Sequence, residues 1–309
     1  MKFFSMFSGI GGFELGIQKA LQDNVLLQKC KHQEKNTRCG HNSRVGPKQT
    51  TGLGCIGFSE INKYAIQIYK RHFPNHKEYD DVSKIKWSDV ENFGLLVGGF
   101  PCQSFSIAGK RRGFSDTRGT LFFEIIRCLR EKQPRLLLLE NVKGLLSHDK
   151  GQTFLRILTT LDELGYDLQW QVLNSKDFGV PQNRERVFIV GHLRGTGRPQ
   201  VFPIGKDSKQ SITRNKDFIR SWGERSGKRH FYKDNICQSI SSNPNSDNLP
   251  MTGSMKIRRL TPTECERLQG FPDGWTEGVS DTQRYKCLGN AVTVNVIEAI
   301  MRRLICPIT

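Results

Sequence analysis

Short apolar runs, each followed by a stretch of helical periodicity, recur through the first two thirds of the chain. The apolar runs are continuous, which is typical of strands buried on both faces of a parallel sheet. The predicted strands are residues 2–7, 55–59, 93–97, 136–139, 168–173 and 187–190. The predicted helices are residues 13–21, 62–72, 261–269 and 292–304. This alternation predicts an α/β fold with a doubly wound, mostly parallel sheet.

Two segments depart from the pattern, and both are basic. Residues 29–48 carry six basic residues and one acidic residue, a net charge of +5. Residues 195–257 have few apolar runs and carry 11 basic against 5 acidic residues, a net charge of +6. We interpret the first as an insertion between a helix and the next strand. The second is a small separate module or a set of long loops.

The composition narrows the class of protein. The 309 residues carry a formal net charge of +17, which suggests a polyanionic partner. No apolar run reaches the roughly 18 residues of a membrane helix, and residues 1–8 lack the layout of a signal peptide. Membrane and secreted proteins are therefore not expected. The nine cysteines are an odd number without a secretory context, so we expect free thiols and a cytoplasmic protein.

A glycine-rich turn, Phe-Ser-Gly-Ile-Gly-Gly at residues 7–12, follows the first predicted strand. Glycines there let the backbone approach a ligand, while the next helix directs its N–H groups towards it. Glu60, at the end of the second strand, stands where such folds place an acid on a ribose hydroxyl. The turn predicts a nucleotide-like cofactor, but many glycine turns after strands are only structural.

A cysteine lies at the end of the third predicted strand, in the sequence Gly-Gly-Phe-Pro-Cys-Gln-Ser-Phe-Ser of residues 98–106. The carboxyl edge of an open α/β sheet is where ligands bind, so Cys102 is a candidate nucleophile. The basic, glycine-punctuated residues 109–120 have the character of a mobile loop over a site. The alternative is a buried thiol that happens to lie at a turn.

Charged residues follow the fourth strand and precede the sixth. Glu140 comes directly after four leucines, and burial there would raise its pKa towards a proton-donating role. Arg184 and Arg186 are two residues apart, so in a strand they project to the same side, where they suit a phosphate or a carboxylate. A solvated glutamate and a surface ion-pair cluster are the ordinary alternatives.

Taken together, these motifs resemble the conserved blocks of DNA (cytosine-5)-methyltransferases of the prokaryotic or phage restriction-modification type. The resemblance spans residues 3 to about 300 and leaves only residues 195–257 unmatched. The blocks, in chain order, are FSGIGG, GGFPCQSFS, LENV, QNRERV, RRLTPTECERLQGFPD and LGNAV. The resemblance implies a Rossmann-like S-adenosylmethionine-dependent methyltransferase fold with a small target-recognition domain. Residues 1–194 and 258–309 would form a discontinuous catalytic domain, with 195–257 as the target-recognition region.

The resemblance also implies a mechanism. A thiolate at Cys102 adds to carbon 6 of cytosine and makes carbon 5 nucleophilic. Glu140 contacts ring N3 and acts as general acid. Asn141 braces the turn of Pro101 and Cys102, and Arg184 and Arg186 hold the activated base and Glu140. Loss of the C5 proton and departure of the thiolate release 5-methylcytosine.

The implied methyl donor is S-adenosyl-L-methionine, with S-adenosyl-L-homocysteine as product. The donor-site residues that the resemblance implies are Phe7, Gly9, Ile10, Gly11, Gly12, Glu60, Asp81, Val82, Gly99, Asn290 and Val292.

The implied partner is double-stranded DNA, from which the target cytosine must be flipped out. A cognate restriction endonuclease acting on the same site is a possible partner, and we expect a monomer. The DNA-contacting residues that we predict are Gln103, Ser106, Arg214, Arg220, Arg225, Lys228, Arg229 and Ser239. The alternatives are a tRNA cytosine-5 methyltransferase, since tRNA-acting relatives share these motifs, and a catalytically inactive DNA-binding relative. A nicotinamide oxidoreductase would leave the cysteine and glutamate motifs unexplained.

The basic insertion raises the question of a metal site. Cysteine and histidine are residue types that bind zinc, and five of them lie in or near the insertion: Cys30, His32, Cys39, His41 and Cys55. Their spacing matches no common zinc finger, so we predict no metal and interpret residues 29–48 as a flexible basic loop near DNA.

Overall fold

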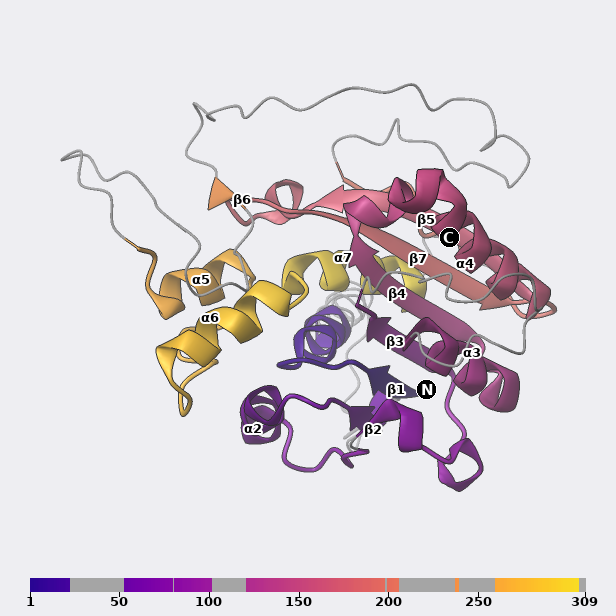
Figure 1. The fold of residues 1–309 in the computed structure, drawn as a ribbon, viewed down its shortest axis with the longest axis horizontal. Coiled ribbons are helices and arrows are strands. Elements are labelled where there is room, and N and C mark those ends of the chain that lie inside the picture. The colour runs from indigo at the N-terminus through magenta and orange to yellow at the C-terminus, as the bar shows by residue number, and fades with distance from the viewer. Residues whose placement is uncertain are drawn as a thin grey trace, which may run out of the picture.

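A six-stranded sheet with the order β2-β1-β3-β4-β7-β5 organises the fold of this computed structural model (Figure 1). The structure describes residues 1–22, 53–79, 81–101, 121–197, 199–205, 237–238 and 259–305. The strands of the sheet are β1 Lys2–Met6, β2 Gly54–Ser59, β3 Leu95–Gly99, β4 Leu136–Val142, β5 Tyr166–Asn174 and β7 Glu185–Leu193. The doubly wound α/β fold predicted from the sequence is confirmed.

The direction of β7 differs from the prediction. Strands β1 to β4 pair in parallel, but β7 is antiparallel to both of its neighbours, β4 and β5. The chain reaches β7 from β5 through residues 175–184, which contain a short 3-10 turn and the two-residue strand β6 Gln182–Asn183. A parallel neighbour requires a crossover of a dozen or more residues, so this short connection produces an antiparallel pair. The apolar run of β7 does not carry that information.

Helices cover both faces of the sheet, as the alternation of strand side chains requires (Figure 1). On one face, Phe4 and Met6 pack in a core with α3 Leu121–Lys132 and α4 Gln152–Glu163. On the other, Phe3 packs with the helix at residues 12–22 and with α7 Val294–Ile305. Each strand therefore buries both of its faces, which explains the continuous apolar runs.

A third core cluster joins the region of β2 to the C-terminal part of the chain. It combines α2 Lys63–His72 with α5 Pro262–Leu268 and α6 Asp281–Asn290. A capping box of Thr261 and Glu264 fixes the start of α5. Helices α3, α4 and α6 were not predicted from the sequence. The first two are nonetheless amphipathic, each with a buried face towards the sheet.

The segment at residues 199–205 packs with the sheet although the apolar pattern weakens at residue 195. Val201, Phe202 and Ile204 are buried in the same core as α7. Two buried glutamines of β5 hold the backbone of the segment: Gln169 donates to Pro199 O at 2.9 Å, and Gln171 donates to Ile204 O at 3.1 Å. The sheet core therefore extends to about this point of the chain.

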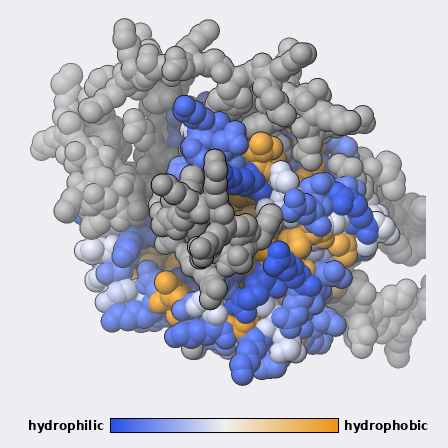
Figure 2. Space-filling model, turned by 45° about the vertical axis from the view of Figure 1, so that its right-hand side comes forward, coloured by the Kyte–Doolittle hydropathy of each residue, from blue (hydrophilic) through white to orange (hydrophobic). Residues whose placement is uncertain are grey.

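The face shown in Figure 2 is largely hydrophilic, with hydrophobic residues in small separate groups. Among the described residues, the large hydrophobic side chains that are exposed are Met1, Ile61 and Val142. No helix within the described ranges has the length and apolar character needed to cross a membrane.

Candidate active site

The predicted site residues gather at one edge of the sheet, where β1 to β4 end. The chain leaves β1 towards β2 on one side of the sheet and later returns to β3 on the other side of β1. Such a reversal of strand order opens a crevice beyond the carboxyl ends of the strands, where α/β proteins bind ligands. The glycine turn, Glu60, Gly99 and Glu140 all lie at this edge.

The glycine turn after β1 has a backbone conformation that favours glycine at two positions. Gly9 and Gly11 have φ values of 56° and 88°, and Phe7, with φ 55°, also lies in the left-handed region. A Cβ on Gly11 would stand 2.5 Å from the Phe73 ring. Gly11 N–H closes the turn by donating to Ser8 O at 3.1 Å. The sequence predicted this turn, and the reason for its glycines is now visible.

Glu60 ties the glycine turn to the start of α2. One carboxylate oxygen, Oε2, accepts a hydrogen bond from Gly9 N–H at 2.9 Å. The other, Oε1, accepts from the N–H groups of Ile61 and Asn62, both at 2.9 Å. Glu60 is only partly buried, so its oxygens retain lone pairs for a hydroxyl group from the solvent side. The carboxylate has a structural role that its position in the sequence did not reveal.

The remaining predicted donor-site residues differ in their surroundings. Asp81 caps a 3-10 turn at Val82–Lys84 and accepts from Ser83 N–H, which lowers the pKa of its carboxyl. The Val82 side chain is buried in the core, and its carbonyl accepts a 2.7 Å hydrogen bond from Arg127 of α3. Asn290 is exposed at the end of α6.

Val292 packs directly between the glycine turn and the end of β3. A Cβ on Gly12 would lie 2.7 Å from Val292 Cγ2, and a Cβ on Gly99 would lie 3.8 Å from Val292 Cγ1. The same Cβ on Gly99 would come within 3.1 Å of Glu140 Oε2. These contacts bring four separate predicted motifs together at one place.

Asn141 connects the ends of β3 and β4. Its Nδ2 donates to Phe100 O at 2.8 Å, and its Oδ1 accepts from Val142 N–H at 2.8 Å. The side chain is 2% exposed, and its bond to Phe100 O is buried. The Phe100 carbonyl belongs to the peptide bond that joins Phe100 to Pro101. Pro101 is exposed and is the last residue that the structure describes before residue 121. Asn141 thus anchors the backbone from which residue 102 follows.

Glu140 is a buried acid at the sheet edge. It lies within β4, and its Oε1 is 3.1 Å from Nε of Arg186. Burial raises the pKa of Glu140, and the nearby guanidinium groups of Arg186 and Arg184 oppose this only in part. A carboxyl in such surroundings holds a proton more readily than one in water. This is the property that a general acid needs.

Arg184 lies near Glu140 and Arg186 and also binds a second part of the chain. Its Nη2 donates to the carbonyls of Gly289 and Ala291, each at 2.9 Å, and so binds the end of α6. It precedes β7, so the two-residue alternation of a strand does not govern it. Within the described residues its Nε and Nη1 have no hydrogen-bond partner. Burial, and then the charge of Arg186, lowers the pKa of Arg184 to about 9.

Sequence reasoning missed two large side chains beside the glycine turn. Ile61 follows Glu60 and is 74% exposed, which is unusual for an isoleucine next to a predicted ligand site. Trp275 donates its indole N–H to the Ile10 carbonyl of the turn. The isolated isoleucine after Glu60 was a weak signal in the sequence, whereas nothing local linked Trp275 to the turn.

Several predicted residues lie outside the described part of the chain. They include the candidate nucleophile and all predicted DNA contacts: Cys102, Gln103, Ser106, Arg214, Arg220, Arg225, Lys228, Arg229 and Ser239. Four of the five residues weighed for zinc also lie outside it: Cys30, His32, Cys39 and His41.

Cys55, the fifth residue weighed for zinc, lies in β2. Burial, and then the charge of Glu14, raises the pKa of its thiol to about 12, which disfavours the thiolate that zinc requires. The described residues contain no group of three or more His, Cys, Asp or Glu side chains that could hold a metal.

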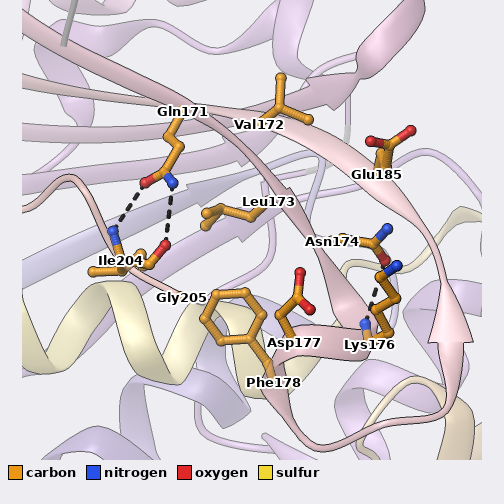
Figure 3. Close-up of a pocket in the computed structure, with 10 residues that line it drawn as sticks. All are labelled: Gln171, Val172, Leu173, Asn174, Lys176, Asp177, Phe178, Glu185, Ile204 and Gly205. Carbon is orange, nitrogen blue, oxygen red and sulfur yellow. Dashed lines mark hydrogen bonds between the residues drawn. The ribbon is translucent and has the colours of Figure 1, made fainter. Parts of the chain in front are cut away.

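A pocket lies beside the end of β5 (Figure 3). Its walls include Gln171, Phe178 and Ile204, and two hydrogen bonds join Gln171 to the Ile204 backbone. Glu185 at its rim forms a 2.8 Å ion pair with Lys143. None of the predicted catalytic or donor-site residues lines this pocket.

Comparison with known proteins identifies the family that this arrangement matches. The model of the C-5 cytosine-specific DNA methylase family matches residues 1–244 and 204–306. The chain is 40% identical over 292 residues to the Type II methyltransferase M1.ScrFI of Lactococcus lactis subsp. cremoris, covering 85% of this chain and 75% of that protein. It is 35% identical to the Type II methyltransferase M.NlaX of Neisseria lactamica, covering 98% and 96%. Its fold resembles that of the S. pombe Dnmt2 methyltransferase, with a TM-score of 0.65, 19% identity and 99% of each chain covered.

Proposed function

The chain belongs to the C-5 cytosine-specific DNA methylase family, and from that premise we propose a complete reaction for it. It is a DNA cytosine-5 methyltransferase. In our proposal it transfers the methyl group of S-adenosyl-L-methionine to carbon 5 of a cytosine flipped out of a specific double-stranded DNA sequence. The reaction proceeds through a covalent bond between Cys102 and carbon 6 of that cytosine.

The observation that carries this proposal is the state of Glu140. The side chain is 9% exposed, has its pKa raised by burial, and is oriented by Arg186 at the edge where β3 delivers residue 102. An acid whose pKa is raised by burial gives up its proton less readily to water and is better suited to donate it to ring N3 as the thiolate adds. A surface glutamate would be ionised and could only accept a hydrogen bond.

The residues at the donor crevice fit S-adenosyl-L-methionine. The glycine turn leaves open space at Gly9, where a Cβ would meet nothing within 4 Å. Glu60 can accept from the ribose hydroxyls, and exposed Ile61 offers an apolar surface for the adenine. Gly99, Asp81, Asn290 and Val292 complete the proposed donor site. When bound, the donor supplies an electrophilic methyl group.

The chain's own residues carry the remaining steps. The Cys102 thiolate forms a bond to carbon 6, the C5–C6 double bond shifts its electrons towards carbon 5, and Glu140 supplies a proton at N3. Arg186 keeps the Glu140 carboxyl in place, and Asn141 holds the backbone before Cys102. Once carbon 5 is methylated, its proton passes to water, the C5–C6 double bond re-forms as Cys102 departs with its electron pair, and N3 returns its proton to the Glu140 carboxylate.

DNA recognition is proposed for residues 195–257, with Arg214, Arg220, Arg225, Lys228 and Arg229 among the contacts. A protein that neutralises several phosphates releases counterions, so its DNA affinity should fall steeply with added salt. A cognate restriction endonuclease and a monomeric state stay predictions.

The direct test is bisulfite sequencing of DNA from cells that express this chain, with Cys102→Ser as control. The expected result is 5-methylcytosine at one fixed position in a short sequence motif, absent from the Cys102→Ser cells. Purified protein should methylate duplex DNA and not tRNA. Methylation of tRNA alone would favour the RNA-directed alternative, and wild-type methylation by Cys102→Ser would refute the covalent mechanism.

A further inference from the structure

The glycine turn is held by a side chain from the opposite end of the chain. Trp275 Nε1–H donates to the Ile10 carbonyl at 2.9 Å, in a buried contact. The other end of the same peptide group, Gly11 N–H, donates to Ser8 O at 3.1 Å. The Ile10–Gly11 peptide is therefore fixed at both its carbonyl and its N–H. Glu60 holds the Ser8–Gly9 peptide in the same way, through Gly9 N–H.

Trp275 is itself tightly placed by aromatic neighbours. The His72 ring stacks on it with centroids 3.6 Å apart and the planes 4° from parallel. His72 Nε2 also donates to the Trp275 carbonyl at 2.7 Å. Phe73, whose ring would collide with a Cβ on Gly11, meets Trp275 at a centroid distance of 6.0 Å. The indole is 7% exposed and has little freedom to turn.

Helix α2 also holds the segment that carries Trp275. Arg71 donates to Glu277 O at 2.7 Å, and Gln67 donates to Gly278 O at 3.0 Å. Helix α2 begins three residues after Glu60. Both hydrogen bonds that hold the glycine turn therefore depend on the region of α2. Glu60, just before the helix, accepts from Gly9 N–H, and the helix itself holds the segment of Trp275, which donates to Ile10 O.

We propose that Trp275 is a positioning residue for the methyl-donor site, because its indole N–H sets the Ile10–Gly11 peptide in the orientation that the donor requires. The inference rests on the proposed function, since the glycine turn is the proposed donor-binding turn. A turn with two glycines at positive φ has many accessible conformations, and each fixed peptide removes some of them. Trp275 acts through the backbone and need not touch the donor.

The ordinary alternative is that Trp275 only fills the core between α2 and α6. A packing role predicts lost stability with unchanged donor affinity, whereas a positioning role predicts weaker donor binding after the indole N–H alone is removed. Trp275→Phe makes this change, because it keeps an aromatic ring to stack on His72 and loses the donor atom.

Trp87 provides a matched control. Its indole is 1% exposed, packs edge-on against Phe4 on the far face of the sheet, and has no hydrogen-bond partner for Nε1 among the described residues. Trp87→Phe therefore removes a buried indole N–H without cutting a contact to the glycine turn.

The experiment measures binding of S-adenosyl-L-homocysteine by titration calorimetry, and of duplex DNA without donor, for the wild type and both variants. Trp275→Phe should bind S-adenosyl-L-homocysteine about five- to tenfold more weakly, the effect of one lost hydrogen bond. Its DNA affinity should be unchanged, and its KM for donor should rise while kcat at saturating donor is kept. Trp87→Phe should bind like the wild type.

A second variant covers the case that Trp275→Phe does not fold. Arg71→Met removes the exposed hydrogen bond to Glu277 O, which holds the segment of Trp275, and leaves the core unaltered. It should weaken S-adenosyl-L-homocysteine binding about twofold, the effect expected if the hydrogen bond from Trp275 to Ile10 O is partly lost. Unchanged S-adenosyl-L-homocysteine binding in Trp275→Phe overturns this inference and leaves the proposed function standing. If only Arg71→Met folds, unchanged binding in that variant has the same meaning. An equal loss in Trp87→Phe also overturns it. Wild-type protein that binds no S-adenosyl-L-homocysteine overturns the proposed function, and this inference with it.

Discussion

A buried glutamate under the glycine turn makes the stability of this protein depend on pH. Glu14, in the helix at residues 12–22, is 1% exposed. Tyr69 donates its hydroxyl to Glu14 Oε1 at 3.0 Å, and the same Tyr69 oxygen lies 2.9 Å from His76 Nδ1. Burial raises the pKa of Glu14 from 4.5 to about 7, although hydrogen bonds, including one from Tyr69, oppose this.

The perturbation that isolates this group is Glu14→Gln, which keeps the shape and never ionises. The folded protein holds the Glu14 proton more tightly than the unfolded chain does, so its contribution to stability is fully present below a pH of 4.5 and lost as the pH rises through about 7. The difference between the two pKa values corresponds to about 3 kcal/mol, at about 1.4 kcal/mol for each tenfold change. Glu14→Gln should therefore match the wild type near pH 4.5 and exceed its stability by up to about 3 kcal/mol above pH 8.

The assay is urea unfolding followed by circular dichroism at several values from about pH 4.5 to pH 8.5, with the free energy taken from the unfolding transition of the catalytic domain. The quantity of interest is the difference in free energy of unfolding between variant and wild type at each pH. Exposed Glu131 of α3 supplies the control, and Glu131→Gln should show no comparable trend. A difference for Glu14→Gln that is constant with pH, or that favours the variant in acid, would refute this account of the buried carboxyl.

Three further substitutions test the site. Glu140→Gln removes the proposed general acid, so kcat for DNA methylation should fall about 100-fold or more. Binding of S-adenosyl-L-homocysteine, measured by calorimetry, should be unchanged. A fall in kcat of less than tenfold would argue against the acid role. Arg184→Lys removes the Nη2 atom that donates to two carbonyls at the end of α6, and thermal unfolding should show about 1–3 kcal/mol of lost stability, with reduced methylation. Gly11→Ala drives a Cβ to 2.5 Å from the Phe73 ring at a φ of 88°, and should cost about 1–3 kcal/mol and weaken donor binding. Gly54→Ala, where a Cβ would meet nothing within 4 Å, is its control and should change neither quantity.

The strands were predictable because each one is a local feature. β1 and β4 are buried on both faces, so their apolar runs stand out from the sequence around them. The motifs at their carboxyl ends followed from the same fact, since parallel strands deliver their last residues to one edge. The glycine turn, Glu60 and Glu140 were therefore found at the site without any tertiary information.

The direction of β7 was not predictable in this way. Its apolar residues are the same whether the strand is parallel or antiparallel, and only the short connection from β5 decides between the two. The buried segment at residues 199–205 was also missed. Its short apolar stretch contains a proline and gains its partners from β5 and α7, which lie far away in the sequence.

The sequence by itself determined which chemistry this protein carries: a cysteine after a proline, a glutamate after an apolar strand, and a glycine turn with its acid. Residue types and their spacing specify these features, because a reacting group must be present in the chain before it can be positioned. Only the tertiary structure determined the pKa values and the hydrogen-bond partners of those groups. The pKa of Glu140 is raised because the sheet buries it, and Arg184 donates to two backbone carbonyls because α6 ends beside it. The pKa of a carboxyl and the partner of an indole N–H depend on atoms brought close by folding: Arg186 is 46 residues from Glu140, and Trp275 is 265 residues from Ile10.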